Sequence, residues 1–399
     1  MNPTCAKVFP TPIDAARTMR GREGFVFLDS VISGAGAVSL LACEPELVVE
    51  GRSWEALEKK VLEWEDGSKG AAIGWVGYDG VFRFGFYRKV HRFFHGPNHW
   101  DEVPPSIDGE IVTRGNQPRF VAETRQEKFL EMAGRAQDYI AAGDIYQVCL
   151  SHRFVANGDF DAWGYYEWLR VHSPAPFGAY LDAGSVKVAS ASPESFLAMR
   201  NREILTRPIK GTRPRAMDVD GDRANAGELV NSPKEIAELT MITDLERNDL
   251  GRVCKYGTVE VPVLLQLEAF RQVFHLVSTV QGQLREGVSH VRALRECFPG
   301  GSITGAPKRR AMEIIEELEP VPRGIYTGAI GYFGFDGTSG FSIAIRTAVF
   351  EAGMAHFHAG AGIVADSVPE REWEETWHKA AALLPDALGS AEKSPDVIR

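Results

Sequence analysis

Short apolar runs separated by glycine-rich turns dominate the first hundred residues of the chain. Residues 24–42, GFVFLDSVISGAGAVSLLA, and residues 71–87, AAIGWVGYDGVFRFGFY, both show this pattern. It is typical of antiparallel strands joined by tight turns. Proline, glycine and aspartate gather in residues 95–110, where we expect a long loop.

The first clear helical pattern covers residues 125–142. Apolar side chains recur there at a spacing of three and four residues, which places them on one helical face: Phe129, Met132, Ala133, Ala136 and Ile140. Gly143 follows and predicts the end of the helix.

The rest of the chain returns to strand-like segments, many of them bounded by glycine. They lie at residues 145–154, 177–182, 186–190, 195–199, 203–209, 324–335, 340–350 and 355–364. Closely spaced strands with few intervening helices predict an α+β fold, in which large antiparallel β-sheets pack together with helices on the outside.

Three regions are expected along the chain. Residues 1–120 should form a β-rich N-terminal region that packs on a catalytic region at residues 121–388. The polar end, residues 389–399, is expected to be a disordered tail.

One predicted helix begins at the sequence NSPKEIAEL. Ser232 suits the N-cap, Pro233 the first helical position, and Glu235 completes a capping box. Glu235 and Glu238 are three residues apart and therefore share a face. Taken alone, this pattern favours a cap and a solvated acid over a binding site.

A second helix start repeats the device. Ser367 and Pro369 precede Glu372 and Glu375, which are again three residues apart. Two helix starts that each present two carboxylates could hold Mg²⁺, which binds a few carboxylates together with water and substrate oxygens. The spacing alone leaves the metal site and the solvated acids about equally open.

Composition and charge narrow the possible partners and location. The 399 residues carry a net charge of −10, which disfavours nucleic acid as a partner. No run of 18 apolar residues occurs, the first twenty residues lack an apolar core, and the five cysteines are widely spaced. We therefore expect a cytoplasmic protein with reduced thiols and no contact with membranes.

Two further motifs are open to misinterpretation. The Gly360–x–Gly362 sequence after a predicted strand superficially matches a dinucleotide-binding turn, but Pro369 prevents the required helix from growing there. In residues 207–215, RPIKGTRPR, Lys210 stands beside a Gly–Thr pair. The residues alone favour an ordinary salt-bridging lysine in a basic loop.

Several ordered segments together resemble one family, the chorismate-utilising enzymes. The matching segments are GDIYQVCLS, SASPESFL, RPIKGTRPR, SPKEIAELTMITDLERNDLGRVC, VFHLVSTV, FPGGSITGAPKRRAMEII, GIYTGAIGY, IAIRTA and HAGAGIVADSVPEREWEET. They run from about residue 125 to residue 385. The family includes the first components of anthranilate and aminodeoxychorismate synthases, and the isochorismate and salicylate synthases.

The resemblance implies a site for chorismate and Mg²⁺. Glu238 and Glu375 would bind the metal, and Glu235 and Glu372 would support it. The substrate would contact a further group of residues: Gly211, Thr212, His275, Tyr326, Arg346, Gly360 and Gly362. Glu194 would be the general acid that protonates the departing hydroxyl group.

Within the family, two positions separate the branches. Isochorismate and salicylate synthases carry a water-activating lysine where this chain has Gln147, which lacks useful basicity. At the position of Lys210, anthranilate synthases carry alanine. The aminodeoxychorismate synthase branch carries lysine there, as this chain does. Lys210 would then act as a nucleophile that forms a covalent intermediate with the ring.

The same resemblance implies a glutamine amidotransferase subunit that supplies ammonia, because no glutamine-hydrolysing cysteine motif is visible. An anthranilate synthase is the first alternative, and a non-catalytic amino-acid-binding relative is the second. Asp29, in FLDS, stands where feedback-inhibited anthranilate synthases hold tryptophan, and whether this segment binds anything is open.

Overall fold

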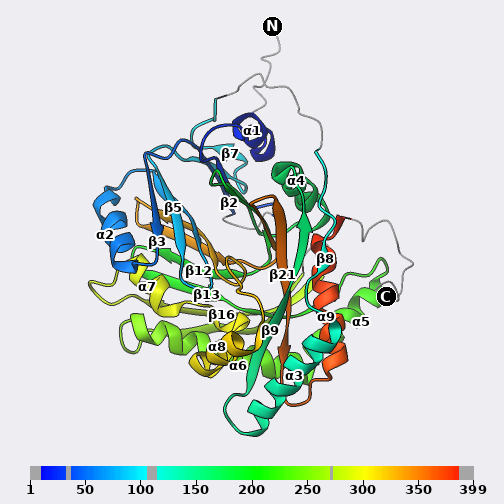
Figure 1. Ribbon diagram of the computed structural model, residues 1–399. Helices are drawn as coiled ribbons and strands as arrows, with labels where there is room; N and C mark the ends of the chain where they lie inside the picture. The colour runs from blue at the N-terminus through cyan, green and yellow to red at the C-terminus, as the bar shows by residue number, and fades with distance from the viewer. Residues whose placement is uncertain (1–9, 33–36, 106–114, 270–272, 386–399) are drawn as a thin grey trace.

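The computed structural model describes residues 10–32, 37–105, 115–269 and 273–385, and its strands form two large sheets (Figure 1). All strand pairs in these residues are antiparallel. Helices pack outside the sheets, so the predicted α+β architecture is confirmed.

The first sheet has eleven strands. Its order is β17 (Gly305–Ala306), β9 (Gln147–Asn157), β21 (Met354–Ile363), β20 (Thr347–Glu351), β11 (Val186–Ser192), β10 (Phe177–Asp182), β1 (Val26–Asp29), β2 (Val38–Ala42), β6 (His91–Phe94) and β7 (His99–Trp100), with β8 (Val121–Ala122) paired to β9.

The second sheet has ten strands. Its order is β14 (Ile209–Pro214), β16 (Val273–Gln283), β13 (Glu203–Arg207), β12 (Ser195–Arg200), β19 (Thr338–Ile343), β18 (Ala329–Gly334), β4 (Ala71–Val76), β5 (Phe82–Tyr87) and β3 (Leu47–Gly51), with β15 (Glu260–Ala269) paired to β16.

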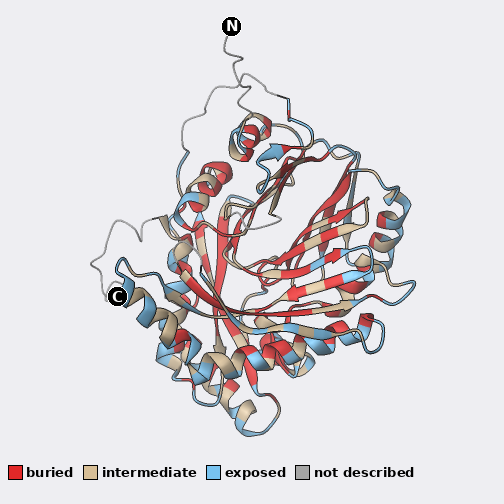
Figure 2. Ribbon diagram, turned by 180° about the vertical axis from the view of Figure 1, so that it is seen from behind, coloured by how far each residue is buried: buried red, intermediate tan, exposed pale blue. Residues whose placement is uncertain are grey.

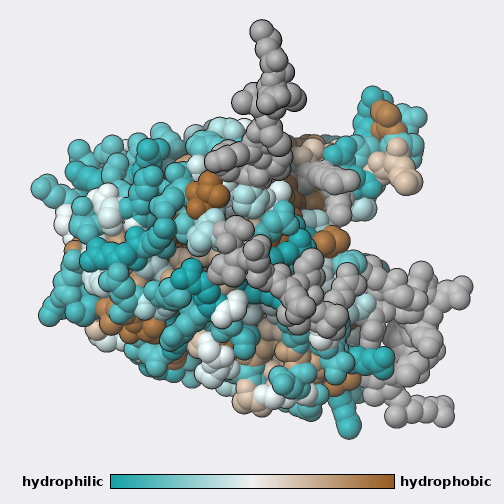
Figure 3. Space-filling model, turned by 90° about the horizontal axis from the view of Figure 1, so that it is seen from above, coloured by the Kyte–Doolittle hydropathy of each residue, from teal (hydrophilic) through white to brown (hydrophobic). Residues whose placement is uncertain are grey.

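The α-helices of the described residues are α1 (Pro12–Met19), α2 (Trp54–Trp64), α3 (Gln126–Ala141), α4 (Ala162–His172), α5 (Val219–Val230), α6 (Pro233–Val253), α7 (His290–Cys297), α8 (Lys308–Leu318) and α9 (Pro369–Ala380). Helices α2, α6 and α7 share a core with the second sheet, and α1, α4 and α9 share one with the first. None of these helices is long and apolar enough to cross a membrane. The face seen from above is mainly hydrophilic, with hydrophobic atoms in small separate patches (Figure 3).

A third core lies between the two sheets. It joins Val26 and Leu40 of the first sheet to Ile73 and Trp75 of the second, and all four side chains are buried. Seen from behind, the strands are buried along most of their length, while exposed residues gather on the outer helices (Figure 2). The chain therefore has a packed layer on each face of both sheets.

The helix predictions hold closely. Helix α3 begins and ends within one residue of the expected range, and the Ser232 side chain accepts a hydrogen bond from the backbone N–H of Glu235, as a cap should. Helix α9 differs, because Val368 is its N-cap. The Ser367 hydroxyl instead donates to a carboxylate oxygen of Glu372, at 2.8 Å.

The N-terminal strands are part of both sheets rather than a separate layer. Strand β1 pairs with β10, and β4 pairs with β18. Strands from before and after residue 120 are therefore hydrogen-bonded to each other in both sheets, and neither sheet is interrupted at the expected boundary. The predicted loop at residues 95–110 contains the short strand β7, which pairs with β6. The predicted tail at residues 389–399 lies outside the described residues.

Substitution of Phe84 would test how tightly the core of the second sheet is packed. Its side chain is fully buried and contacts Phe333 and Phe341 at ring-centroid distances of 5.4 and 6.3 Å. Phe84→Ala is expected to lower the free energy of unfolding by about 3–5 kcal/mol, measured by urea denaturation. Val48→Ala on β3, whose side chain is 40% exposed, is the control and should change it by less than about 1 kcal/mol. Equal losses in both variants would contradict this packing.

Candidate active site

A cavity of about 580 Å³ collects the residues predicted to be functional. All of them except Glu372 line it: Glu194, Lys210, Gly211, Thr212, Glu235, Glu238, His275, Tyr326, Arg346, Gly360, Gly362 and Glu375. They come from strands of both sheets, from loops next to these strands, and from the first two turns of α6 and α9. Residues spread over more than 180 positions of sequence therefore meet in one site.

Strand β14 places Lys210 at the cavity by means of an irregularity in its pairing. Its register against β16 shifts between Lys210 and Thr212, where Gly211 has a φ of +72°. A Cβ atom on Gly211 would come within 2.5 Å of Leu229 and 3.0 Å of the Glu235 carboxyl group, so only glycine fits. The Lys210 ammonium then lies 3.8 Å from a carboxylate oxygen of Glu238.

Thr212 and His275 form a pair across the same two strands. The Thr212 hydroxyl and Nδ1 of His275 lie 3.1 Å apart. Burial lowers the pKa of His275, although the backbone carbonyl of Gly211 opposes this effect. A neutral imidazole and a hydroxyl can both donate and accept hydrogen bonds along the cavity wall.

Glu194 lies between β11 and β12 and is only 7% exposed. Burial raises the pKa of its carboxyl group, while the Ser302 hydroxyl and the Lys210 ammonium oppose the rise. The net effect is a pKa above that of an ordinary glutamic acid, so the proton is kept to a higher pH. The protonated form is the state that a general acid needs before it donates a proton.

Glutamates from α6 and α9 approach one another across Lys234. The Lys234 ammonium is 3.9 Å from Glu238 and 4.0 Å from Glu372. Burial, followed by the charge of Glu238, raises the pKa of Glu235, and burial raises that of Glu372. The two helix starts therefore concentrate negative charge that needs cations to balance it.

The pKa of Glu375 shifts in the opposite direction to those of Glu235 and Glu372. Burial opposes its ionisation, but Lys379, whose ammonium is 2.7 Å away, lowers its pKa overall. Lys379 also donates to the backbone carbonyl of Gly360, at 2.9 Å. This lysine thus links α9 to β21 at the edge of the cavity.

The carboxylates of α6 and α9 are candidate ligands for Mg²⁺. In the described ranges, no group of three or more His, Cys, Asp or Glu side chains is arranged closely enough to bind a metal unaided. The donors are nevertheless hard oxygen atoms, and Oε2 of Glu372 is buried without a hydrogen-bond partner among the described residues. This donor set fits Mg²⁺, which takes its remaining ligands from water and substrate.

Arg346 and Tyr326 also line the cavity. Among the described residues no carboxylate pairs with the Arg346 guanidinium, and burial alone lowers its pKa. Burial raises the pKa of Tyr326, so its hydroxyl keeps its proton. A cation without a protein counter-charge and a neutral hydroxyl suit an anionic carboxylate ligand.

Arg346→Gln is expected to raise the KM for an anionic substrate by about 10- to 100-fold, because a charge-assisted hydrogen bond is lost. Steady-state kinetics will measure this effect. Arg292→Gln, on the outer helix α7, is the control and should leave KM unchanged. An unaltered KM in Arg346→Gln would remove this residue from substrate binding.

Gly360 and Gly362 lie in β21, opposite Ser151 and Cys149 of β9. A Cβ on Gly360 would come within 2.7 Å of a backbone oxygen and 3.1 Å of the Tyr326 hydroxyl. Glycine at these two positions therefore keeps the cavity open beside the strand. Neither residue belongs to a turn before a helix, in agreement with the rejection of a dinucleotide site.

The structure adds residues that the sequence did not single out. Ser302, Lys234, Lys379 and His358 all line the cavity. His358 stacks on Tyr326 with ring centroids 5.2 Å apart. The only signals in the sequence are the spacing of four residues between Glu375 and Lys379 and the position of Lys234 beside Glu235.

The structure also shows the burial and the contacts of two residues at positions where related enzymes differ, Gln147 and Asp29. Gln147 is buried in β9, and a Cβ on Gly362 would lie 2.6 Å from its amide nitrogen. Asp29 in β1 is buried and accepts hydrogen bonds from Nε of Arg170, at 2.5 Å, and from the Tyr166 hydroxyl, at 3.0 Å. Its charge is therefore already balanced within the protein.

Comparisons with known proteins agree with this geometry. A sequence model described as chorismate binding enzyme matches residues 97–385. The chain is 50% identical over 280 residues to anthranilate synthase component 1 of Thermus thermophilus, covering 70% of this chain and 60% of that protein. It is 44% identical over 284 residues to aminodeoxychorismate synthase component 1 of Bacillus subtilis, covering 71% and 60%. The matched region thus spans about 60% of the length of either relative.

Solved structures show the same fold. Anthranilate synthase component I from Streptococcus pneumoniae superposes with a TM-score of 0.78 at 30% identity, covering 88% of this chain and 93% of that one. The menaquinone-specific isochorismate synthase from Escherichia coli has a TM-score of 0.78 at 19% identity, covering 93% and 90%, a likeness of fold alone.

Proposed function

This chain belongs to the chorismate-binding enzyme family, and we propose that it converts chorismate and ammonia to 4-amino-4-deoxychorismate. The observation that carries the proposal is the position of Lys210. It lies in the cavity, 3.8 Å from Glu238, and its charge acts on Glu194. A lysine that shares a cavity with a buried carboxyl group can attack a ring from which that carboxyl group, as an acid, removes a hydroxyl group.

The chemistry requires an amine at C4 with the configuration of the original hydroxyl group, which two successive displacements provide. The Lys210 amine, acting through its free electron pair, adds to C2, both double bonds of the conjugated ring diene shift, and the C4 hydroxyl leaves as water with the proton of Glu194. Ammonia then adds to C4, both double bonds shift back, and the C2–N bond breaks with its electron pair returning to Lys210. The proton that the added ammonia loses restores Glu194.

The other lining residues hold the substrate. Arg346 and Tyr326 would bind one carboxylate of chorismate, helped by the backbone of Gly360 and Gly362. Gly211, Thr212 and His275 would line the ring. The substrate is then held with C2 towards β14, the strand that carries Lys210.

Mg²⁺ would be held by Glu238 and Glu375, with Glu235 and Glu372 in support. When bound, it would balance these carboxylates and attract the ring carboxylate of chorismate. Lys234 and Lys379 supply part of the balancing charge from the protein itself.

A glutamine amidotransferase subunit would supply the ammonia. Both relatives named above are called component 1, which supports a second component. Burial raises the pKa of Cys254 to about 11 and that of Cys297 also, so neither thiol is a ready nucleophile for glutamine.

Anthranilate synthase component I is the second candidate. It is favoured by the 50% identity to the Thermus thermophilus protein, against 44% to the aminodeoxychorismate synthase. Overall identity reflects the whole matched region, whereas the position of amination depends on the few side chains that face C2 and C4. Lys210 therefore outweighs the six-point difference.

Product analysis tests the proposal. The chain is incubated with chorismate, Mg²⁺ and ammonium at mildly alkaline pH, and the products are identified by mass and fluorescence. We expect aminodeoxychorismate, which an added lyase converts to 4-aminobenzoate. Anthranilate with pyruvate would overturn the assignment. Glutamine in place of ammonium should give no product without the partner subunit.

A further inference from the structure

A buried arginine, Arg323, lies next to the active-site cavity. Its side chain is only 1% exposed. Nε and Nη2 donate to the two carboxylate oxygens of Glu319, at 2.9 and 2.7 Å. Nη1 donates to the backbone oxygen of Ile303, at 3.0 Å, and to the Thr327 hydroxyl, at 3.2 Å, while Nη2 also donates to the backbone oxygen of Cys149, at 2.6 Å. These five bonds match the five N–H donors of a guanidinium, so the group is fixed in one orientation.

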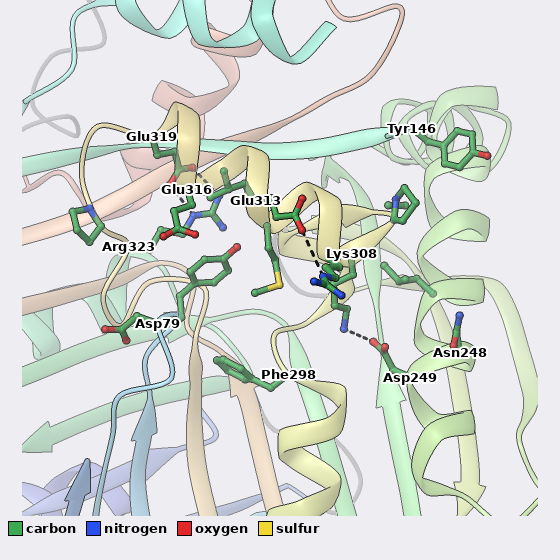
Figure 4. A pocket seen from close by; sticks show the side chains of 18 of the residues that line it. Asp79, Tyr146, Asn248, Asp249, Phe298, Lys308, Glu313, Glu316, Glu319 and Arg323 are labelled. Carbon is green, nitrogen blue, oxygen red and sulfur yellow. Dashed lines mark hydrogen bonds and ion pairs between the residues drawn. The ribbon is translucent and has the colours of Figure 1, made fainter. Parts of the chain in front are cut away.

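The partners of Arg323 connect two separate hollows of the protein. Cys149 and Ile303 line the active-site cavity of about 580 Å³. Arg323 itself and Glu319 lie together at the edge of a second hollow, of about 1260 Å³ (Figure 4). Glu319 also accepts hydrogen bonds from the backbone N–H and the hydroxyl of Ser151 in β9, at 2.7 and 2.9 Å. The ion pair therefore belongs to the layer of protein between the two hollows.

The Arg323 guanidinium also lies over two tyrosine rings, one from each hollow. It is 4.7 Å from the ring centroid of Tyr78, which lines the second hollow, and 5.8 Å from that of Tyr326, which lines the active-site cavity. Both distances are in the range of cation–π interactions. The His358 ring stacks on Tyr326 with centroids 5.2 Å apart. Contacts with a guanidinium and an imidazole thus set the orientation of the Tyr326 ring.

The residue after Tyr326 has an unusual backbone conformation. Thr327 is fully buried and has a φ of +59°, a region that a β-branched residue rarely adopts. Such a conformation persists only where the surroundings hold it. The Thr327 hydroxyl accepts the hydrogen bond from Arg323 and itself donates to the backbone oxygen of Tyr326, at 2.6 Å. Arg323 therefore supports the backbone at Tyr326 as well as its ring.

Stability alone is a weak explanation for the pair of Arg323 and Glu319. Replacement of a buried ion pair by apolar residues of similar volume is often neutral or stabilising. The other bonds of Arg323 converge on backbone groups at the cavity wall and on the neighbour of Tyr326. This arrangement favours a role in shaping the site.

We propose that Arg323, held by Glu319, is a positioning residue that directs the Tyr326 hydroxyl towards a carboxylate of bound chorismate. Arg323 does not itself line the active-site cavity, so it acts through Tyr326. The inference rests on the role in substrate binding that is proposed above for Tyr326. A guanidinium suits this task because its planar fork fixes several partners at once, whereas the ammonium of lysine is a point charge on a flexible stem.

Arg323→Lys tests the inference, because it keeps the charge and removes the fork. The Kd for chorismate, measured by isothermal titration calorimetry with Mg²⁺ and without ammonia, should rise by about tenfold, the effect of losing one charge-assisted hydrogen bond. With ammonium and saturating chorismate, kcat should change by less than about threefold, because binding rather than the reaction is weakened. Tyr326→Phe should raise the Kd by a similar factor, and the double variant should raise it no further than Tyr326→Phe alone.

Arg310 on α8 offers a matched control. It also pairs with a carboxylate, that of Asp144 at 2.7 Å, and lies over a ring, that of Tyr139 at 5.1 Å, but it lines neither hollow. Arg310→Lys should therefore leave the Kd unchanged. Glu319→Gln serves as a second variant if Arg323→Lys does not fold. It should raise the Kd as well, because Arg323 loses its counter-charge.

A spectroscopic measurement tests the position of Tyr326 without an activity assay. The protein is labelled with 3-fluorotyrosine, and the fluorine resonance of Tyr326 is identified by its absence from Tyr326→Phe. This resonance should shift or broaden in Arg323→Lys and stay in place in Arg310→Lys.

Three results would overturn the inference: an unaltered Tyr326 resonance in Arg323→Lys, losses of affinity that add in the double variant, or a Tyr326→Phe protein that binds chorismate as tightly as the wild type. Formation of anthranilate would instead overturn the proposed product. It would leave the binding and resonance tests of Arg323 in force, because both reactions start from bound chorismate.

Discussion

Lys210→Ala is expected to lower the rate of chorismate amination at C4 by at least about 10³-fold, because removal of a nucleophile eliminates the first displacement. Intact-protein mass spectrometry should show a covalent substrate adduct in the wild type that is absent from the variant. The side chain has a fixed place in the cavity, beside Glu238. Loss of the amine therefore removes both the bond-forming atom and a positive charge.

Lys210→Arg separates these two roles. Arginine keeps the charge near Glu238 but cannot serve as the nucleophile, so we expect it to be as inactive as alanine. Lys255→Ala, at an exposed position after α6, is the control for general effects of losing a lysine. High activity in Lys210→Arg would assign Lys210 an electrostatic role, and an adduct that survives in Lys210→Ala would place the nucleophile elsewhere.

Glu194→Gln should reduce kcat by about 10²- to 10⁴-fold, the usual range for a general acid. The amide is similar in size and can still interact with the Ser302 hydroxyl, so substrate binding should be largely kept. Pre-steady-state mixing should show that formation of the covalent adduct has slowed. A variant that forms the adduct at the wild-type rate would assign the proton to another donor.

The pH dependence follows from the direction of the shift. Burial raises the pKa of Glu194, so its protonated form persists to a higher pH than in an ordinary glutamic acid. In the wild type, the contribution of Glu194 to kcat should be complete below that pKa and be lost as the pH rises through it. The residual activity of Glu194→Gln should lack this decline. A decline that persists in the variant would belong to a different group.

Local patterns were sufficient for three of the helices and for many strands, whereas most site residues followed from the family resemblance. The capping sequence at Ser232 and the apolar spacing of residues 125–142 depend on neighbours within one or two helical turns, and the structure reproduces both. All predicted site residues except Glu372 line one cavity, and the motifs that carry them lie on both sheets and on α6 and α9. Their roles in binding and catalysis remain predictions.

Partners set by tertiary contact were not visible in the sequence. Lys234 of α6 approaches Glu372 of α9, and these two helices begin about 135 residues apart in the chain. Ser302 bonds to Glu194 from a turn more than 100 residues later in the chain. Two arginines of RPIKGTRPR likewise have carboxylate partners that lie outside this motif. Arg207 pairs with Glu268 and Arg215 with Asp222, so they are partly neutralised before they can act on Lys210.

The shared sheets have a consequence for how this protein can be divided. Strand β1 lies between β10 and β2, and β4 lies between β18 and β5, so residues 26–87 complete both sheets around strands that carry the site. A fragment cut at residue 120 would expose two long strand edges and the apolar layer around Val188 and Ile330. Such a fragment is expected to aggregate, and insertions or fusions would be tolerated better at exposed loops than at this boundary.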